Sequence, residues 1–266
     1  MDALTAFEAA IGAKLVNARL DGAREPPFAV LDFDNTCIVN DVGEATLAFM
    51  CRNHLLRCGD LLPPGGQPCN PAYHEQVFRH YYHLLNGGDI RAASLLCAGI
   101  FAGFRPDEAA AVASAALNAE GATPGETELF DLPVARGLML RPALHRLIEF
   151  SITNAIRIWI VSASPAIAVR AAMQRFGLPG NLIALRHRID GEVLSRALEA
   201  PHSIAEGKVD CIKTFIDRSQ RPLFAVGDSV YDLPMLEYAD VRAVVERDNA
   251  MTQEAHRRGW FVLPNS

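Results

Sequence analysis

Four short stretches of this chain are almost wholly apolar, and three of them end abruptly in polar residues. The stretches are residues 28–33, 156–161, 223–226 and 241–245. Continuous apolar character over so few residues is typical of strands that are buried on both faces of a parallel sheet. Helical patterns over 165–176, 205–216 and 232–238 separate the later stretches, and this alternation predicts an α/β fold built on a parallel sheet.

The segment from 41 to 138 has a different character. It is rich in alanine and leucine, it shows no convincing strand, and clusters of proline and glycine divide it into helical segments. We therefore expect an α-helical cap over 41–138, inserted after the first strand into a core that comprises 1–40 and 139–266. Residues 182–196 contain Asp190-Gly191 between two short runs of strand character, which predicts a β-hairpin within the core.

The composition excludes several classes of protein. The net charge of −6 argues against a general nucleic-acid-binding protein, which needs a basic surface. The first 20 residues do not resemble a signal peptide, and no apolar run reaches the ~18 residues of a membrane span. The six cysteines form no CxxC pair, so buried thiols in a reducing compartment are the simpler interpretation. We therefore expect a cytoplasmic protein with no membrane or nucleic-acid partner.

Polar side chains follow the predicted strands at the edge of the sheet where ligands bind in open α/β folds. Asp32 and Asp34 follow the first strand, Ser162 follows the second, and Asp228 follows the third. Lys208 begins the helix between the second and third strands. One carboxylate of the first pair can attack phosphorus while the other protonates the leaving oxygen. Together these groups are those that phosphoryl transfer to a carboxylate requires.

Phosphate chemistry also explains the remaining charges. Asp228 and Asp232 add negative charge that a hard cation must neutralise, and oxygen ligands beside a phosphate favour Mg²⁺. The hydroxyl of Ser162 and the ammonium of Lys208 can hold the non-bridging phosphate oxygens. Each motif alone is more often a turn or a helix cap. All four in this order, three of them at strand ends, favour a catalytic site.

These motifs resemble those of the haloacid dehalogenase superfamily. They read Leu31-Asp-Phe-Asp-Asn-Thr36, Ile160-Val-Ser162, Gly207-Lys208 and Gly227-Asp-Ser-Val-Tyr-Asp232. The resemblance implies a Rossmann-like core of the haloacid dehalogenase type. The insert directly after the first motif is similar to the cap of phosphoserine phosphatase-like members, and Asp-Asn-Thr followed by Ser-Ala-Ser is closer to phosphorylcholine phosphatase-like members of that branch.

The resemblance also implies a Mg²⁺-dependent phosphatase that hydrolyses small phosphate monoesters. Asp32 would form an aspartyl-phosphate, and Asp34 would act as general acid and then as general base. Asp228, a carboxylate oxygen of Asp32 and the backbone carbonyl of Asp34 would bind Mg²⁺. Asp232 would lie near Lys208 in the next layer. The residues that would bind phosphate are Thr36, Ser162, Ala163 and Lys208.

The choice of substrate is expected to depend on the cap. Asp41 and Glu44 come soon after the first motif, where one of them can pair with a cationic group of the substrate. The alternative is that both merely cap the first helix of the insert near its N-terminus. Tyr81 and Tyr82 offer an aromatic wall for an ammonium group, or belong to the core. The corresponding substrates are small phosphorylated metabolites of the phosphoethanolamine, phosphocholine or phosphoserine type.

Two other functions are compatible with these motifs. A phosphotransferase of the same superfamily would pass the phosphoryl group to an alcohol instead of water, and a cap that excludes bulk water serves either outcome. A non-catalytic module that binds phosphorylated ligands is the other alternative. The presence of both Asp32 and Asp34 argues against such a module, because a protein without catalysis has no need to keep the pair.

Overall fold

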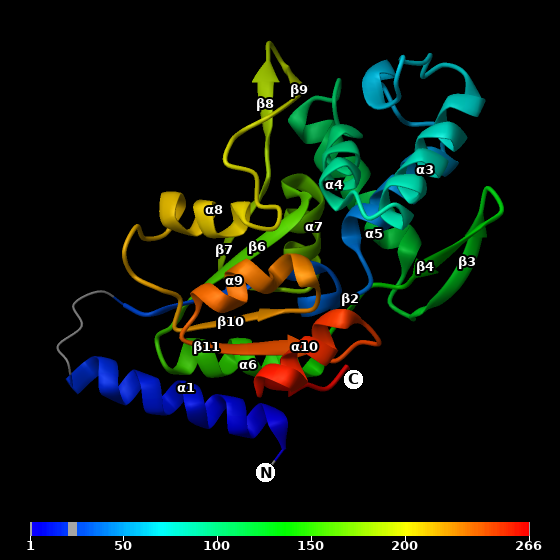
Figure 1. Cartoon of the computed structure of the whole chain (residues 1–266). Coiled ribbons are helices and arrows are strands. Elements are labelled where there is room, and N and C mark those ends of the chain that lie inside the picture. Colours follow the sequence, from blue (N-terminus) through cyan, green and yellow to red (C-terminus); the bar gives the residue numbers. More distant parts are fainter. Residues whose placement is uncertain (1, 21–25, 266) are drawn as a thin grey trace.

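A six-stranded parallel sheet forms the centre of the molecule (Figure 1). This computed structural model describes residues 2–20 and 26–265. In sheet order the strands are β12 (Phe261–Leu263), β11 (Val241–Val245), β10 (Phe224–Gly227), β1 (Phe28–Leu31), β6 (Arg157–Pro165) and β7 (Asn181–Leu185). Every pairing within this sheet is parallel, which confirms the predicted fold class.

Strand β1 lies in the middle of the sheet, and its position follows from its sequence. All four of its residues are apolar and buried, because helices cover both faces of the sheet. Leu31 lies level with Ile160 of β6 and with Val226 of β10. The polar residues that come after these three positions are therefore brought to one edge of the sheet, as the apolar runs predict.

Neighbouring residues of β1 pack against different sets of helices. Ala29 and Leu31 belong to the cluster that contains α1 and α6, whereas Phe28 and Val30 belong to the cluster that contains α8, α9 and α10. This alternation is the ordinary geometry of a strand. The helices outside the insert are α1 (Ala3–Leu20), α6 (Pro142–Thr153), α7 (Ala166–Arg175), α8 (Gly207–Phe215), α9 (Leu233–Tyr238) and α10 (Ala250–Arg258), with the short 3-10 helix η3 (Val230–Asp232) before α9.

The insert between β1 and β6 forms a separate group of helices to one side of the sheet (Figure 1). Its helices are α2 (Val42–Arg52), the 3-10 helix η2 (Gly59–Leu61), α3 (Pro71–Asn86), α4 (Ile90–Gly99) and α5 (Pro106–Glu120). Three of them begin at a residue whose side chain accepts a hydrogen bond from the first turn of the helix. These residues are Asp41 for α2, Asn70 for α3 and Asp89 for α4. Such caps explain why the helices start where they do.

The insert is not wholly helical, so the prediction of an α-helical cap is partly wrong. Strands β3 (Gly125–Leu129) and β4 (Leu132–Arg136) form an antiparallel hairpin. The turn consists of Phe130 and Asp131, both with positive φ, in place of the glycine-containing pairs that mark most such turns. Most side chains of the hairpin are exposed, so its strands lack the apolar alternation by which a strand is recognised in a sequence.

A short antiparallel pair lies where the chain passes between the core and the insert. The π-helix η1 (Phe33–Cys37) connects β1 to β2 (Ile38–Val39), and β2 pairs with β5 (Met139–Leu140). This pair is close to the predicted boundaries at 40 and 139. The division of the chain into a core and a cap at those residues stays a prediction.

The hairpin predicted over 182–196 begins later than expected. Most of its first arm belongs to β7 at the edge of the parallel sheet, where apolar side chains are buried. The hairpin itself consists of β8 (His187–Asp190) and β9 (Val193–Leu198). The backbone of Leu194 exchanges two hydrogen bonds with residues 103–104, so the hairpin attaches the core to the insert without a covalent link.

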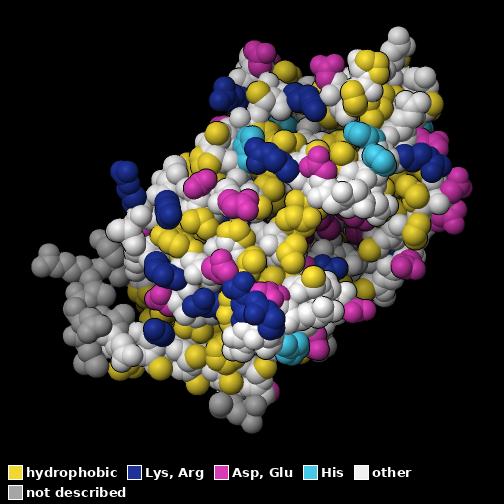
Figure 2. Space-filling model, in the orientation of Figure 1, with side chains coloured by type: hydrophobic (Ala, Val, Ile, Leu, Met, Phe, Trp, Pro, Cys, Tyr) yellow, Lys and Arg dark blue, Asp and Glu magenta, His cyan; other side chains and the backbone are white. Residues whose placement is uncertain are grey.

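The surface carries charged and apolar side chains side by side, as Figure 2 shows for one face. A hollow on this face lies between the insert and the core, and acidic side chains lie within it. Within the described ranges, 2–20 and 26–265, the helices are too short or too polar to cross a lipid bilayer. The hollow coincides with a pocket that adjoins the carboxyl ends of β1, β6 and β10.

Phe7→Ala should lower the free energy of unfolding by about 3–5 kcal/mol, because it removes apolar contacts and leaves a cavity. The ring of Phe7 on α1 is fully buried, with its centroid 5.6 Å from that of Phe224 and 5.3 Å from that of Phe261. Val16→Ala on the same helix is the control, since Val16 is 55% exposed, and should change stability by less than about 0.5 kcal/mol. Urea unfolding followed by circular dichroism measures both, and equal losses would contradict the packing of α1.

Candidate active site

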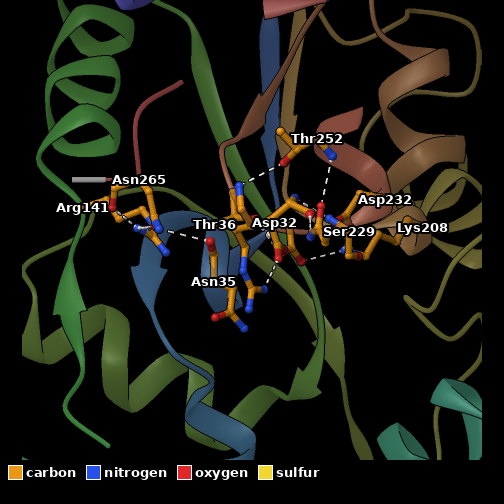
Figure 3. Close-up of polar contacts among 12 residues, drawn as sticks. Asp32, Asn35, Thr36, Arg141, Lys208, Ser229, Asp232, Thr252 and Asn265 are labelled. Atoms are coloured by element: carbon orange, nitrogen blue, oxygen red, sulfur yellow. Dashed lines mark hydrogen bonds and ion pairs between the residues drawn. The ribbon is translucent and has the colours of Figure 1, made fainter. Parts of the chain in front are cut away.

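Asp32 lies directly after β1 and lines the pocket. Figure 3 shows it beside Lys208 and Thr36. Its Oδ1 accepts a hydrogen bond from Nζ of Lys208 at 2.6 Å, and its Oδ2 accepts one from Oγ1 of Thr36 at 2.9 Å. The side chain is buried although it lines the pocket. Donors on both oxygens hold this carboxylate in one orientation, which a nucleophile requires.

Lys208 links two carboxylates that come from distant parts of the chain. Its Nζ lies 2.6 Å from Oδ1 of Asp32 and 2.5 Å from Oδ1 of Asp232, and all three side chains are buried. The second oxygen of Asp232 accepts hydrogen bonds from the N–H groups of Asp228 and Ser229 and from the Ser229 hydroxyl. Both oxygens of Asp232 are therefore engaged in holding Lys208 and the loop that follows β10.

Two glycines allow the chain to pack this closely. A Cβ atom at Gly207 would lie 2.0 Å from the backbone oxygen of His202, and one at Gly227 would lie 2.5 Å from Cβ of Asp232. Both distances are too short for any side chain. The glycines that precede Lys208 and Asp228 in the two motifs are therefore needed for the approach of the backbone.

Asp228 receives donors on both of its carboxylate oxygens. Oγ1 of Thr36 lies 3.1 Å from Oδ1, and Nη1 of Arg247 lies 2.5 Å from Oδ2. The single hydroxyl hydrogen of Thr36 is shared between Asp228 and Asp32, so this residue bridges the ends of β1 and β10. The Asn249 side chain donates to the backbone oxygen of Asp228 at 2.8 Å.

Arg247 and Asn249 were not among the residues that the motifs predicted. They follow the fourth apolar stretch, which is β11, in the sequence Glu246-Arg-Asp-Asn249. Polar residues after a fourth strand of a parallel sheet are the same signal that identified Asp32, Ser162 and Asp228. The sequence therefore contains the signal, polar residues after an apolar strand, but these two residues belong to none of the four family motifs.

Asp34 lies in η1, whose backbone departs from helical geometry. The next residue, Asn35, has a φ of 58°, which asparagine tolerates better than most residues do. Oδ1 of Asp34 accepts a hydrogen bond from N–H of Val42 at 2.7 Å, and Oδ2 accepts one from the Ser162 hydroxyl at 3.2 Å. The turn thus brings a second carboxylate into the same pocket as Asp32.

The predicted phosphate-binding residues fall into two groups. Ala163 and Lys208 line the pocket. Thr36 and Ser162 are fully buried, and their hydroxyls donate to the two carboxylates of the first motif. In this structure the two hydroxyls orient carboxylates, and direct binding of phosphate by them stays a prediction.

Burial raises the pKa values of the carboxyl groups in the pocket. Burial and, after it, the charge of Asp232 raise the pKa of Asp32 to about 8, although Lys208 acts in the opposite direction. Burial and nearby carboxylates raise the pKa of Asp34 well above its usual range, which favours its protonated form. Burial and Asp232 raise the pKa of Asp228 to about 6. Burial is the largest cause of each shift, and neighbouring carboxylates add to it.

A hard divalent cation fits this cluster of acids. Asp32, Asp228 and Asp232 are buried, and each has an oxygen within 4.8 Å of the others. Carboxylate oxygens are the ligands that such cations prefer. Asp232 accepts four hydrogen bonds, from Lys208 and from the loop after β10, whereas Asp32 and Asp228 accept two each. Asp32 and Asp228 are therefore the better candidates to bind the cation. A bound cation would favour the ionised form of both.

The pocket has a volume of about 300 Å³ and is lined by the core and the insert. Asp41 caps α2, because its Oδ1 accepts a hydrogen bond from N–H of Glu44 at 2.9 Å, and it also lines the pocket. Glu44 accepts a hydrogen bond from the Tyr82 hydroxyl at 2.6 Å. Burial and the nearby Asp41 raise the pKa of Glu44 to about 7. Tyr81 is buried and forms part of the pocket wall.

Comparison of sequences relates the chain to known hydrolases. The profile of a family described as haloacid dehalogenase-like hydrolase matches residues 29–237, which include all four motifs. A protein of Mycobacterium tuberculosis that is named a probable phosphatase is 41% identical over 61 residues, or 22% of this chain. The chain spans 21% of the length of that protein and 36% of the length of a relative from Mycobacterium leprae.

Solved structures with the same fold include two that extend over most of the chain. A protein of unknown function from Bordetella pertussis Tohama I has a TM-score of 0.69 at 19% identity, over 91% of this chain and 99% of that chain. A substrate-bound phosphoserine phosphatase has a TM-score of 0.53 at 13% identity, over 87% of this chain and 90% of that chain. At these identities the similarity shows the fold alone, and it is the predicted Rossmann-like core.

Lys208→Met should be strongly destabilising, because it leaves two buried carboxylates without their shared cation. Removal of one partner from a buried ion pair costs about 3–5 kcal/mol. Lys213→Met on the same helix is the matched control, since Lys213 is exposed and its ammonium lies 5.0 Å from the centre of the Tyr238 ring. That variant should lose less than about 1 kcal/mol. Urea unfolding at neutral pH compares the two, and a Lys208→Met protein as stable as the control would refute the buried ion cluster.

Proposed function

Because the chain belongs to the haloacid dehalogenase-like hydrolases, we propose that it hydrolyses small phosphate monoesters through a covalent intermediate on Asp32. The observation that carries the proposal is the pairing of two different carboxyl groups in one pocket. Asp32 is paired with Lys208, a cation, whereas burial and neighbouring carboxylates raise the pKa of Asp34 well above its usual range, which favours its protonated form. One group is thus suited to attack, and the other to donate a proton.

The proposed reaction has two steps. An oxygen of Asp32 attacks phosphorus, the bond to the ester oxygen breaks, and Asp34 gives its proton to the leaving alcohol. In the second step Asp34 accepts a proton from water, whose oxygen attacks phosphorus and releases inorganic phosphate together with the free carboxylate of Asp32. The Ser162 hydroxyl, which donates to Asp34, orients this acid and base for both steps. Lys208 favours the ionised form of Asp32 that attack requires.

Magnesium is the proposed cofactor. Asp32 and Asp228, through carboxylate oxygens, and Asp34, through its backbone carbonyl, would hold it. When bound, Mg²⁺ neutralises charge on the phosphate group and on the acidic cluster. Asp232 supports the site from behind, because its oxygens already hold Lys208 and the backbone of the next loop.

The charges of the pocket favour a substrate that carries an amine. The residues that line it include six carboxylates and two basic side chains. Lys208 is paired with two of the acids, so the excess of negative charge lies toward the insert, where Asp41 and Glu44 are found. Tyr81 offers a neighbouring aromatic surface. We therefore propose small phosphomonoesters of the phosphoethanolamine, phosphocholine or phosphoserine type as substrates.

Asp32→Asn should reduce turnover by several orders of magnitude with Mg²⁺ and substrate saturating, because an amide cannot form the intermediate. Release of inorganic phosphate from p-nitrophenyl phosphate and phosphoethanolamine measures the loss. Asp240→Asn is the matched control, since Asp240 is exposed and pairs with Arg221 at 3.6 Å. Near wild-type turnover of a folded Asp32→Asn protein would exclude Asp32 as the nucleophile. Transfer of phosphate to added alcohols would instead indicate a phosphotransferase.

The preference for an amine-bearing substrate should increase with pH. Glu44 becomes charged above its pKa of about 7, so its attraction for an ammonium is present at higher pH and is lost as pH falls. The measurement is kcat/KM for phosphoethanolamine divided by kcat/KM for an uncharged alkyl phosphate of similar size. This ratio should rise several-fold between about pH 6 and pH 8. Because it is a ratio, any ionisation that changes kcat/KM equally for both substrates has no effect on it.

Substitution of the carboxylates identifies the group responsible for this preference. Glu44→Gln should remove the rise of the ratio with pH, and Asp41→Asn should lower the ratio at every pH. Glu75→Gln serves as control, because Glu75 pairs with Arg79 on the surface of α3, where their side chains are more than two-fifths exposed. If the protein shows no preference for the amine, or if both variants keep it, the cationic substrate is wrong and the phosphatase proposal is unaffected.

A further inference from the structure

Arg247 reaches the site from the loop after β11 and contacts a proposed ligand of the cation. Its Nη1 lies 2.5 Å from Oδ2 of Asp228, while Oδ1 of Asp228 accepts a hydrogen bond from Thr36 at 3.1 Å. Both oxygens of Asp228 therefore have a donor. A cation that takes Oδ2 as its ligand must replace the guanidinium group, and a cation that takes Oδ1 lies close to it.

The backbone that carries Arg247 is firmly held. Its N–H donates to Oγ1 of Thr252 at 2.9 Å, and N–H of Thr252 donates to the side chain of Asn249 at 3.0 Å. The side chain of Arg247 is less confined, since 38% of it is exposed compared with 5% of the Asp228 side chain. A long, partly exposed side chain on a fixed backbone can change partners by a change of rotamer alone.

Arg247 differs in its accessibility from Lys208, the other basic residue that lines the pocket. The side chain of Lys208 is 3% exposed, and its ammonium lies between two carboxylates. Among the residues described as lining the pocket, Arg247 is therefore the basic side chain that is partly accessible to solvent. The planar guanidinium group matches the oxygens of a phosphate, with which it forms charge-assisted hydrogen bonds.

We infer that Arg247 exchanges partners: it pairs with Asp228 until a divalent cation binds there, and then pairs with the phosphate group of the substrate. This inference rests on the proposed function, because it uses the same cation and the same phosphate ester. The guanidinium group and the cation repel each other and compete for one carboxylate, so each weakens the binding of the other. When substrate enters, its phosphate group gives the displaced guanidinium an anionic partner, which couples the binding of cation and substrate.

Isothermal titration calorimetry on the whole protein tests the exchange in two titrations. The first measures binding of Mg²⁺ alone, and the second measures binding of inorganic phosphate in saturating Mg²⁺. Arg247→Gln should bind Mg²⁺ more tightly than wild type, because a competing positive charge is gone. It should bind phosphate about tenfold more weakly, which corresponds to ~1.4 kcal/mol. Effects of opposite sign do not arise from a general loss of structure.

Two further variants complete the experiment. Arg242→Gln is the matched control, since Arg242 lies on β11 with its guanidinium 5.4 Å from the centre of the Trp260 ring, and it should leave both affinities unchanged. Arg247→Lys keeps the charge without the planar fork, so it should keep the affinity for Mg²⁺ and lose part of the affinity for phosphate. The Arg247→Lys variant tests the exchange of partners if Arg247→Gln does not fold, because an unchanged affinity of Arg247→Lys for phosphate would overturn the exchange.

The outcomes separate this inference from the proposed function. Weaker Mg²⁺ binding by folded Arg247→Gln would mean that Arg247 orients Asp228 for the cation, and the exchange would be wrong. Unchanged phosphate binding would also overturn it. If wild type binds neither Mg²⁺ nor phosphate, the proposed function itself fails. A wild type that binds both, beside an Arg247→Gln protein with the same two affinities, refutes the exchange alone.

Discussion

The buried ammonium of Lys208, shared between Asp32 and Asp232, is the interaction on which the rest of the site depends. It ties the end of β1 to the loop after β10 and to the start of α8. Charges buried this deeply are stable only when they are paired and hydrogen-bonded. Asp232 meets this condition by accepting backbone donors on its other oxygen, and Asp32 meets it through Thr36. These groups therefore lie together because each buried charge needs an opposite charge or hydrogen-bond partners.

The core and the insert contribute different chemistry to the pocket. The core supplies the ends of three parallel strands, which are rigid and place Asp32, Ser162 and Asp228 at one edge of the sheet. The insert supplies Asp41 and Glu44 at the first turn of α2, on a surface whose position depends on packing between helices. The groups proposed to react with the phosphate ester, which must be placed accurately, thus come from the sheet. The groups proposed to select the rest of the substrate come from the insert.

The parts of the fold that could be predicted are those with a strong local pattern. β1, β10 and β11 are buried on both faces, so their apolar runs identified them, and the polar residues after them identified most of the site. The exposed hairpin of β3 and β4 has no such run, and its turn lacks glycine. Arg247 follows a strand that was predicted, but its contact with Asp228 depends on the loop that Asn249 and Thr252 hold. Its position after a strand could be read from the sequence, but the partner that it contacts follows from tertiary packing.

The order of the strands in the sheet determines how late in folding the site can form. The neighbours of β1 in the sheet are β6 and β10, so the strand has no partner close to it in the chain. Lys208 is 176 residues from Asp32, and Asp232 is a further 24 residues away. During synthesis, which proceeds from the N-terminus, the carboxylate of Asp32 exists long before the groups that neutralise it. Pairing across such separations is slow, and the pocket is completed only when β10 has joined the sheet.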